Sequence, residues 1–103
     1  MKNNLNEEFL MSVLRFYYHD EETNNWAISK ATIKAAIDKT LSFLVVEDRV
    51  NSTTHAEIFK VTMIEQKISV HNCTTIGISR RTFYRYKKRY LEVFKTYLLQ
   101  YID

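Results

Sequence analysis

The sequence contains no proline and only one glycine among its 103 residues. An all-β chain of this length would need many turn residues, and these are the residues that turns use most. We therefore predict a mostly helical protein. A single glycine also excludes a phosphate-binding loop, because such loops need several glycines at fixed spacing.

Metal-binding and nucleophilic side chains are scarce as well. The one cysteine, Cys73, excludes an internal disulfide and fits a reducing cytoplasm. The histidines, His19, His55 and His71, are too scattered for a zinc site, and the acidic residues after His19 lack a second ligand pair. Cys73 and His71 would point to different sides of a helix, so they make a poor catalytic pair. We predict no metal, no cofactor and no enzymatic activity.

Long apolar runs are also absent, which predicts no membrane-spanning segment and no membrane partner. The start of the chain, MKNNLNEEFL, is polar and acidic and lacks a secretory pattern. We therefore expect a cytoplasmic protein. The hydrophobic fraction of 46% is ample for one compact core, and a chain of this length suits a single domain.

Charge is distributed unevenly along the chain. Residues 1–50 carry six Lys or Arg against eight Asp or Glu, whereas residues 51–103 carry nine against four. Residues 79–90 hold six basic side chains and no acidic one. Such a local positive field favours a polyanionic partner, and nucleic acid is the first candidate.

The stretch Lys67–Lys88, KISVHNCTTIGISRRTFYRYKK, predicts a helix, a tight turn and a second helix. Gly77 marks the corner, because glycine alone adopts positive φ cheaply. Cys73, four residues earlier, is small enough to let two helices approach closely. Ser79 follows as a natural N-cap. Together these features indicate a helix-turn-helix.

The helix predicted to start at Arg80 has two different faces. Phe83 and Tyr86 share the face that can dock on a core. The opposite face is cationic and consists of Arg81, Arg85 and Lys88, with Tyr84 on its shoulder. A recognition helix needs this division, because its exposed side reads base edges in the major groove. The alternative is a structural helical corner whose basic face is merely solvated.

The rest of the chain predicts a small all-α bundle with a long final helix. We expect a first helix that follows a cap at Asn6 and a second that runs from a cap at Ser29 to about residues 47–49. A third helix is expected over 56–66, capped by Thr53 or Thr54. The final helix is expected over about 80–99. For 57–64 a strand is the alternative, since alternating apolar residues occur there. Residues 1–50 form the amino-terminal helical part and 54–103 the helix-turn-helix part.

For two apolar segments the sequence does not decide whether they pack within the chain or against another copy. Phe43, Leu44, Val45 and Val46 are apolar all round, which predicts the most buried part of the bundle or, alternatively, an oligomer contact. The end of the final helix, KTYLLQYI, packs within the chain or forms a dimer contact.

The stretch GISRRTFYRYKKRYLEVFKTYL, about a fifth of the chain, resembles the end of phage-encoded late-gene and autolysin transcription regulators. These are the ArpU family, related to RinA-type activators, and they end in a helix-turn-helix similar to region 4 of sigma factors. The matching positions are Gly77, Ile78, Ser79, Thr82, Phe83, Tyr84, Arg85 and Lys88. The chain departs from the pattern at Cys73, where alanine is usual, and at Thr75, where leucine is frequent.

The resemblance implies a promoter-binding regulator of phage or prophage genes in a bacterial cytoplasm. Its implied partner is double-stranded DNA, with RNA polymerase and a second copy of the chain as further candidates. The implied base-contacting residues are Arg81, Tyr84, Arg85 and Lys88. The implied phosphate-contacting residues are Ser79, Arg80, Thr82 and Arg89.

Two other functional classes fit the same pattern. A DNA-packaging component such as a small terminase subunit also carries a helix-turn-helix but forms rings. A protein-interaction or inhibitor module could use the same basic, aromatic face against an acidic protein.

Overall fold

The computed structural model describes residues 6–19, 28–69, 73 and 75–102. Its elements in chain order are α1 (Glu7–His19), α2 (Lys30–Asn51), α3 (His55–Phe59), the π-helix η1 (Lys60–Ile64) and α4 (Arg80–Ile102). No strand occurs in these ranges. The predicted all-α bundle with a long final helix is therefore confirmed.

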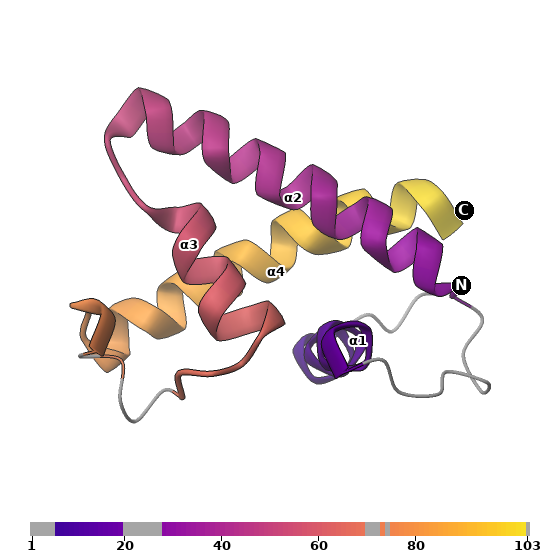
Figure 1. The fold of residues 1–103 in the computed structure, drawn as a ribbon, viewed down its shortest axis with the longest axis horizontal. Coiled ribbons are helices and arrows are strands. Elements are labelled where there is room, and N and C mark those ends of the chain that lie inside the picture. The colour runs from indigo at the N-terminus through magenta and orange to yellow at the C-terminus, as the bar shows by residue number, and fades with distance from the viewer. Residues whose placement is uncertain (1–5, 20–27, 70–72, 74, 103) are drawn as a thin grey trace.

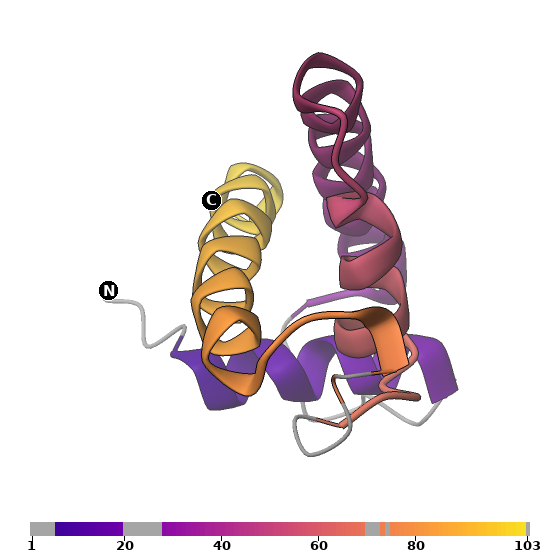
Figure 2. The ribbon, with the colours of Figure 1, turned by 90° about the vertical axis from the view of Figure 1, so that its left-hand side faces the viewer.

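The two long helices, α2 and α4, make the most extensive helix–helix contact (Figure 1). Figure 2 shows α1 lying crosswise at one end of the bundle, where it contacts α2, η1 and α4. The core between these elements is built from large apolar side chains. Its fully buried members include Val13, Leu14, Ile33, Leu44, Phe59, Met63, Tyr90, Phe94 and Leu98. No helix in the described part of the chain has the length and apolar character needed to cross a membrane.

The starts of α1 and α2 follow the sequence prediction. The Asn6 side chain accepts a hydrogen bond from the Phe9 amide at 2.8 Å. The Ser29 hydroxyl accepts one from the Thr32 amide at 3.1 Å. Each cap satisfies one of the amides that a helix start leaves without an intrahelical partner. Local sequence therefore fixes where these two helices begin.

The prediction that Phe43–Val46 is the most buried part of the bundle is wrong. Only Leu44 is buried, whereas Phe43, Val45 and Val46 are 36%, 38% and 59% exposed. The reason is that only one side of α2 is covered there, since its carboxyl-terminal end diverges from α4 (Figure 1). Burial then follows the helical stripe of Ile33, Ile37 and Leu44.

The junction between α2 and α3 is capped by a residue that the sequence reading did not choose. Thr54 occupies the N-cap position of α3 but makes no side-chain cap bond. Asp48 accepts the His55 amide at 2.8 Å and the Ala56 amide at 3.0 Å. It also accepts the Thr53 hydroxyl at 2.5 Å. Neither predicted threonine cap forms, because the amides at the start of α3 already donate to the carboxylate of Asp48, which lies one turn before the end of α2.

The segment 57–64 is helical, so the strand alternative is wrong. Its second half is a π-helix, in which the Glu65 amide donates to the Lys60 carbonyl at 2.9 Å. The wider turn keeps Phe59, Met63 and Ile64 all buried. Gln66 then takes a left-handed φ of 54°, which ends the helix. Its side-chain amide donates to the carbonyls of Met63 and Met11 and so ties this end to α1.

The helix predicted to begin at Lys67 is wrong for residues 67–69, which are not helical. Residues 73, 75 and 76 form a short 3₁₀ turn, and 70–72 and 74 lie outside the described residues. The predicted corner is present, because Gly77 has a φ of +81°. Cys73 is buried, as the close approach of elements there required, and its carbonyl accepts the Ile78 amide at 3.5 Å. Among the described residues, the predicted helix-turn-helix therefore consists of one 3₁₀ turn, a glycine corner and α4.

Candidate nucleic-acid interface

The start of α4 is fixed by its cap and by its buried face. The Ser79 hydroxyl accepts the Thr82 amide at 3.1 Å, which confirms the predicted cap. Phe83 is buried one turn later, followed along the helix by Tyr90, Leu91, Phe94 and Leu98. These residues recur at helical spacing, so the core determines which side of α4 faces outward.

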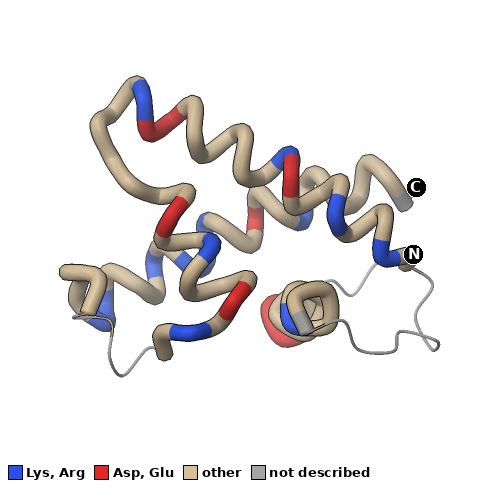
Figure 3. The backbone as a smooth tube through the Cα atoms, viewed as in Figure 1, with Lys and Arg blue, Asp and Glu red and all other residues tan. Residues whose placement is uncertain are grey.

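The outward side carries the predicted base-contacting residues. Arg81, Arg85 and Lys88 are exposed, and Tyr84 between them is 53% exposed. None of these three cations forms an ion pair or hydrogen bond with a residue that the structure describes. Figure 3 shows basic residues succeeding one another along the first half of α4. The start of α4 therefore presents a basic face with an aromatic ring in it.

Ser79 and Thr82 are already engaged in the cap. The Ser79 hydroxyl donates to the Thr82 hydroxyl at 3.0 Å while it accepts the Thr82 amide. Arg80, next to the cap, is exposed and lies close enough to Cys73 to act on it electrostatically. Burial raises the pKa of the Cys73 thiol, and the positive charge of Arg80 opposes that rise. The predicted phosphate-contacting residues around the turn are thus brought together.

Arg89 is held differently from the other cations. It forms a salt bridge with Glu47 of α2, and its guanidinium lies 5.9 Å from the centre of the Phe43 ring. The hydrogen bond from Arg89 lowers the pKa of the Glu47 carboxyl. This contact joins α2 to α4 at the edge of the basic face, so a predicted phosphate contact already has an intramolecular partner.

A polar cluster that sequence reasoning missed sets the position of α4 against α3. The Nδ1 atom of His55 lies 2.6 Å from the phenolic oxygen of Tyr90, and the His55 ring meets Tyr86 edge-on at 4.7 Å. Tyr90 is fully buried, and this burial is the main cause of its raised pKa. Because the two residues are 35 positions apart in sequence, no local pattern could have revealed the contact.

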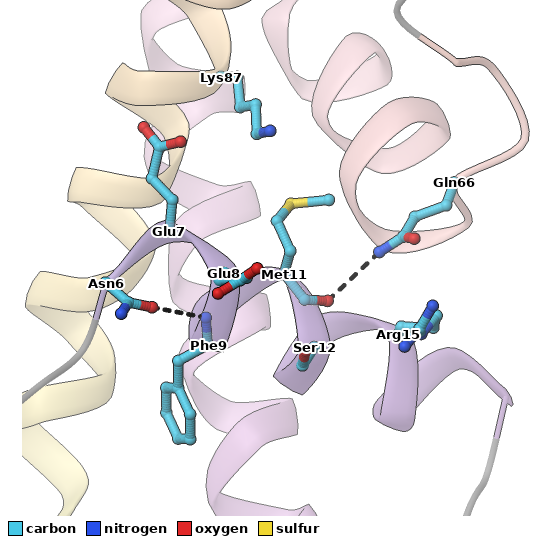
Figure 4. A pocket seen from close by; sticks show the side chains of 9 residues that line it. All are labelled: Asn6, Glu7, Glu8, Phe9, Met11, Ser12, Arg15, Gln66 and Lys87. Carbon is cyan, nitrogen blue, oxygen red and sulfur yellow. Dashed lines mark hydrogen bonds between the residues drawn. The ribbon is translucent and has the colours of Figure 1, made fainter.

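An open pocket of about 1020 Å³ lies beside the basic face (Figure 4). It is bordered by the first turns of α1, by Gln66 and by Lys87 of α4. Glu7 and Glu8 line it together with Arg15 and Lys87, so charges of both signs surround it. The mixed charge gives no preference for an anionic or a cationic ligand. Sequence reasoning missed the pocket because its walls come from three separate segments.

The described residues contain no group of three His, Cys, Asp or Glu side chains arranged to hold a metal ion. His71, and with it the weak Cys73–His71 pair, lies outside them, as does the acidic segment after His19. Comparison with protein-family models, curated proteins and solved structures found no match to this chain. A functional interpretation must therefore start from the basic face of α4.

Proposed function

We propose that this protein is a sequence-specific, double-stranded DNA-binding regulator of transcription that inserts the start of α4 into the major groove. The observation that supports this most is the outward face formed by Arg81, Tyr84, Arg85 and Lys88, whose three cations lack intramolecular partners among the described residues. Residues on the first turns of a recognition helix are the ones that reach base edges.

The base-contacting role is assigned by side-chain chemistry. Arg81 and Arg85 lie one turn apart on the exposed side, and an arginine can donate two hydrogen bonds to the O6 and N7 atoms of guanine. Such a pair discriminates against a wrong base by roughly 1–3 kcal/mol. The exposed ring of Tyr84 gives this face an apolar surface, which suits contact with a thymine methyl group.

Phosphate contacts would supply most of the affinity without sequence information. Ser79, Arg80 and Thr82 surround the start of α4, where free helix amides also favour an anion. Arg89 lies at the opposite edge, and Glu47 competes with phosphate for it. In this proposal DNA binding exchanges the Arg89–Glu47 pair for an Arg89–phosphate pair.

The orientation of α4 does not depend on a long helix before the turn. The buried side chains Phe83, Phe94 and Leu98 hold α4 to the core, and the His55–Tyr90 contact holds it to α3. The 3₁₀ turn and Gly77 then let the chain enter α4 without covering its basic side. A rigid support of this kind is what base readout requires.

The finer parts of the proposal rest on the resemblance of residues 77–98 to the ArpU and RinA-type regulators. They are regulation of phage or prophage genes, location in the cytoplasm of a bacterial host, and contact with RNA polymerase.

Selection of bound sequences from a random DNA pool tests the main proposal. We expect one sequence motif to be enriched. Its affinity should fall with salt at a slope of about −4 to −5 in log K against log salt concentration, as about five neutralised phosphates require. Retention of no DNA at low salt would overturn the proposal. Retention without an enriched motif would leave non-specific binding and remove base readout.

A second candidate function is favoured by the replacement of the predicted helix before the turn by non-helical residues 67–69 and a short 3₁₀ turn. In a helix-turn-helix the first helix crosses the DNA backbone, and the described residues between 67 and 76 contain no α-helix, but only the 3₁₀ residues 73, 75 and 76. The basic face would then bind an acidic protein surface instead. An acidic protein recovered with the wild type and lost with Arg85→Glu, together with no DNA binding at low salt, would favour this candidate.

A further inference from the structure

The carboxyl-terminal half of α2 carries an exposed apolar stripe, and its first member, Phe43, lies under the Arg89 guanidinium of α4. Phe43, Val46 and Val50 recur at i, i+3 and i+7 and are 36%, 59% and 76% exposed. The end of α2 stands away from α4 in both views (Figures 1 and 2). Exposed β-branched residues bring no advantage to a helix, since valine has a lower helix propensity than alanine or leucine. Beyond Phe43, the stripe is therefore an unpartnered contact surface.

The amino-terminal half of α2 carries small residues on the same side. A shallow, open groove of about 270 Å³ lies there, lined by Ala35, Asp38, Lys39 and Ser42 of α2 and by the exposed ring of Tyr101 from α4. At 100° per residue, Ala35, Ser42, Phe43, Val46 and Val50 fall within a sector of about 100°, which also contains the exposed Lys39. One face of α2 thus has large apolar side chains at one end and a groove at the other.

We infer that this face binds a second copy of the chain, with the two α2 helices antiparallel. In an antiparallel pair, the large apolar side chains at the end of each helix lie against the small side chains near the start of the other. The two-fold symmetry produces this contact twice. A two-fold interface needs a surface that is complementary to itself in this way. With Phe43 near the two-fold axis, Val46 faces Ser42 of the second copy and Val50 faces its Ala35. Large residues opposite small ones let helices interdigitate.

Charge on the flank of this face has the same complementarity. Arg49 flanks the large end and is exposed, without an ion pair to any described residue. Asp38 flanks the small end on the same side of the helix, where it pairs with Lys34 at 2.9 Å. A two-fold antiparallel arrangement places Arg49 of each copy beside Asp38 of the other. Both the large and the small residues, and both the positive and the negative charge, lie on one helix. Size and charge therefore favour a second copy of the chain over an unrelated partner.

The interface contains none of the proposed base-contacting residues of α4, so it can be tested without DNA, although Arg89 lies against Phe43 and adjoins both surfaces. The test is the mass of the full chain in solution, measured by light scattering and sedimentation equilibrium without DNA. We expect twice the chain mass of 12.3 kDa. A monomer at the highest soluble concentration, or a ring of more than two copies, would overturn the inference.

Two valines on α2 provide a matched pair of variants. Val46→Glu places a carboxylate in the centre of the interface and should shift the protein to a monomer. Val45→Glu adds the same group at a position 38% exposed, about 100° around the helix from Val46 and next to the flanking Arg49, and should weaken the dimer much less. Equal masses for both variants would contradict the proposed face. Circular dichroism checks that each variant keeps its helix content.

A charge exchange tests the antiparallel arrangement. Arg49→Glu should raise the dimer dissociation constant at least about tenfold, because it places two carboxylates together at each end of the interface. Adding Asp38→Arg should restore the dimer by reversing the pair. A double variant as monomeric as Arg49→Glu alone would overturn the antiparallel register. Since Arg49 and Asp38 are exposed, neither change threatens the fold.

Discussion

Asp48 caps the helix that begins seven residues after it, since its Oδ1 atom accepts the His55 amide at 2.8 Å. Its second oxygen accepts the Ala56 amide at 3.0 Å, so one carboxylate satisfies two of the free amides of α3. Asp48 also lies in the last turns of α2. The Asp48 carboxylate therefore joins the end of α2 to the start of α3, next to the His55–Tyr90 contact.

We predict that Asp48→Ala lowers the free energy of unfolding by about 1–2 kcal/mol, as loss of a helix cap does. The matched control is Thr54→Ala, because Thr54 occupies the N-cap position without making a side-chain cap bond. This control should change the free energy by less than about 0.5 kcal/mol. Urea denaturation of the two variants measures both values. A larger loss for Thr54→Ala would show that the carboxylate is not the effective cap.

Acid should weaken the same region. Burial raises the pKa of Asp48, but the hydrogen bonds from Thr53, Ala56 and His55 outweigh it, so the pKa lies below its ordinary value of 3.8. The hydrogen bond from Arg89 likewise lowers the pKa of Glu47 below its ordinary value of 4.5. A carboxyl group with a depressed pKa stabilises the fold above its unfolded-state pKa and loses that effect as pH falls through the folded-state pKa. We therefore expect stability to fall below about pH 4.5, and less steeply in Asp48→Asn, when thermal unfolding is followed against pH.

Arg85→Ala should weaken binding to the selected DNA motif by roughly 1–3 kcal/mol while it weakens binding to random DNA much less. The physical reason is that a lost base contact removes discrimination, whereas a lost phosphate contact removes affinity for all sequences alike. Fluorescence anisotropy with both DNAs measures the two losses. Lys95→Ala, farther along α4, is the control and should change neither binding constant appreciably. Equal losses on both DNAs for Arg85→Ala would assign Arg85 to phosphate instead.

Glu47→Gln should raise the affinity for DNA a fewfold and steepen its salt dependence. The substitution removes the negative charge that competes for Arg89, so the guanidinium becomes available to phosphate. The free energy of unfolding should change by less than about 1 kcal/mol, because exposed ion pairs contribute little. Titrations at several salt concentrations measure the slope for wild type and variant. An unchanged slope would mean that Arg89 does not reach the DNA backbone.

Caps and corners were predictable because they depend on neighbouring residues. Asn6, Ser29 and Ser79 each cap a helix through an amide three positions ahead, and Gly77 takes the positive φ that its position in the turn required. The outward direction of Arg81 followed from helical spacing alone. One error arose where two capping groups competed, because Asp48 and not a threonine caps α3. Another, the expected burial of Phe43–Val46, arose because the sequence does not show which side of α2 is covered.

Sequence alone therefore determined the helical class, the starts of three helices and the basic composition of the first turns of α4. These features depend on backbone preferences and on hydrogen bonds between residues that are only a few positions apart in the sequence. Tertiary structure alone decided which side of α2 is covered, that Arg89 pairs with Glu47, and that Tyr90 meets His55. Such contacts join residues 35 and 42 positions apart, and their partners are selected by how the helices pack rather than by any local pattern.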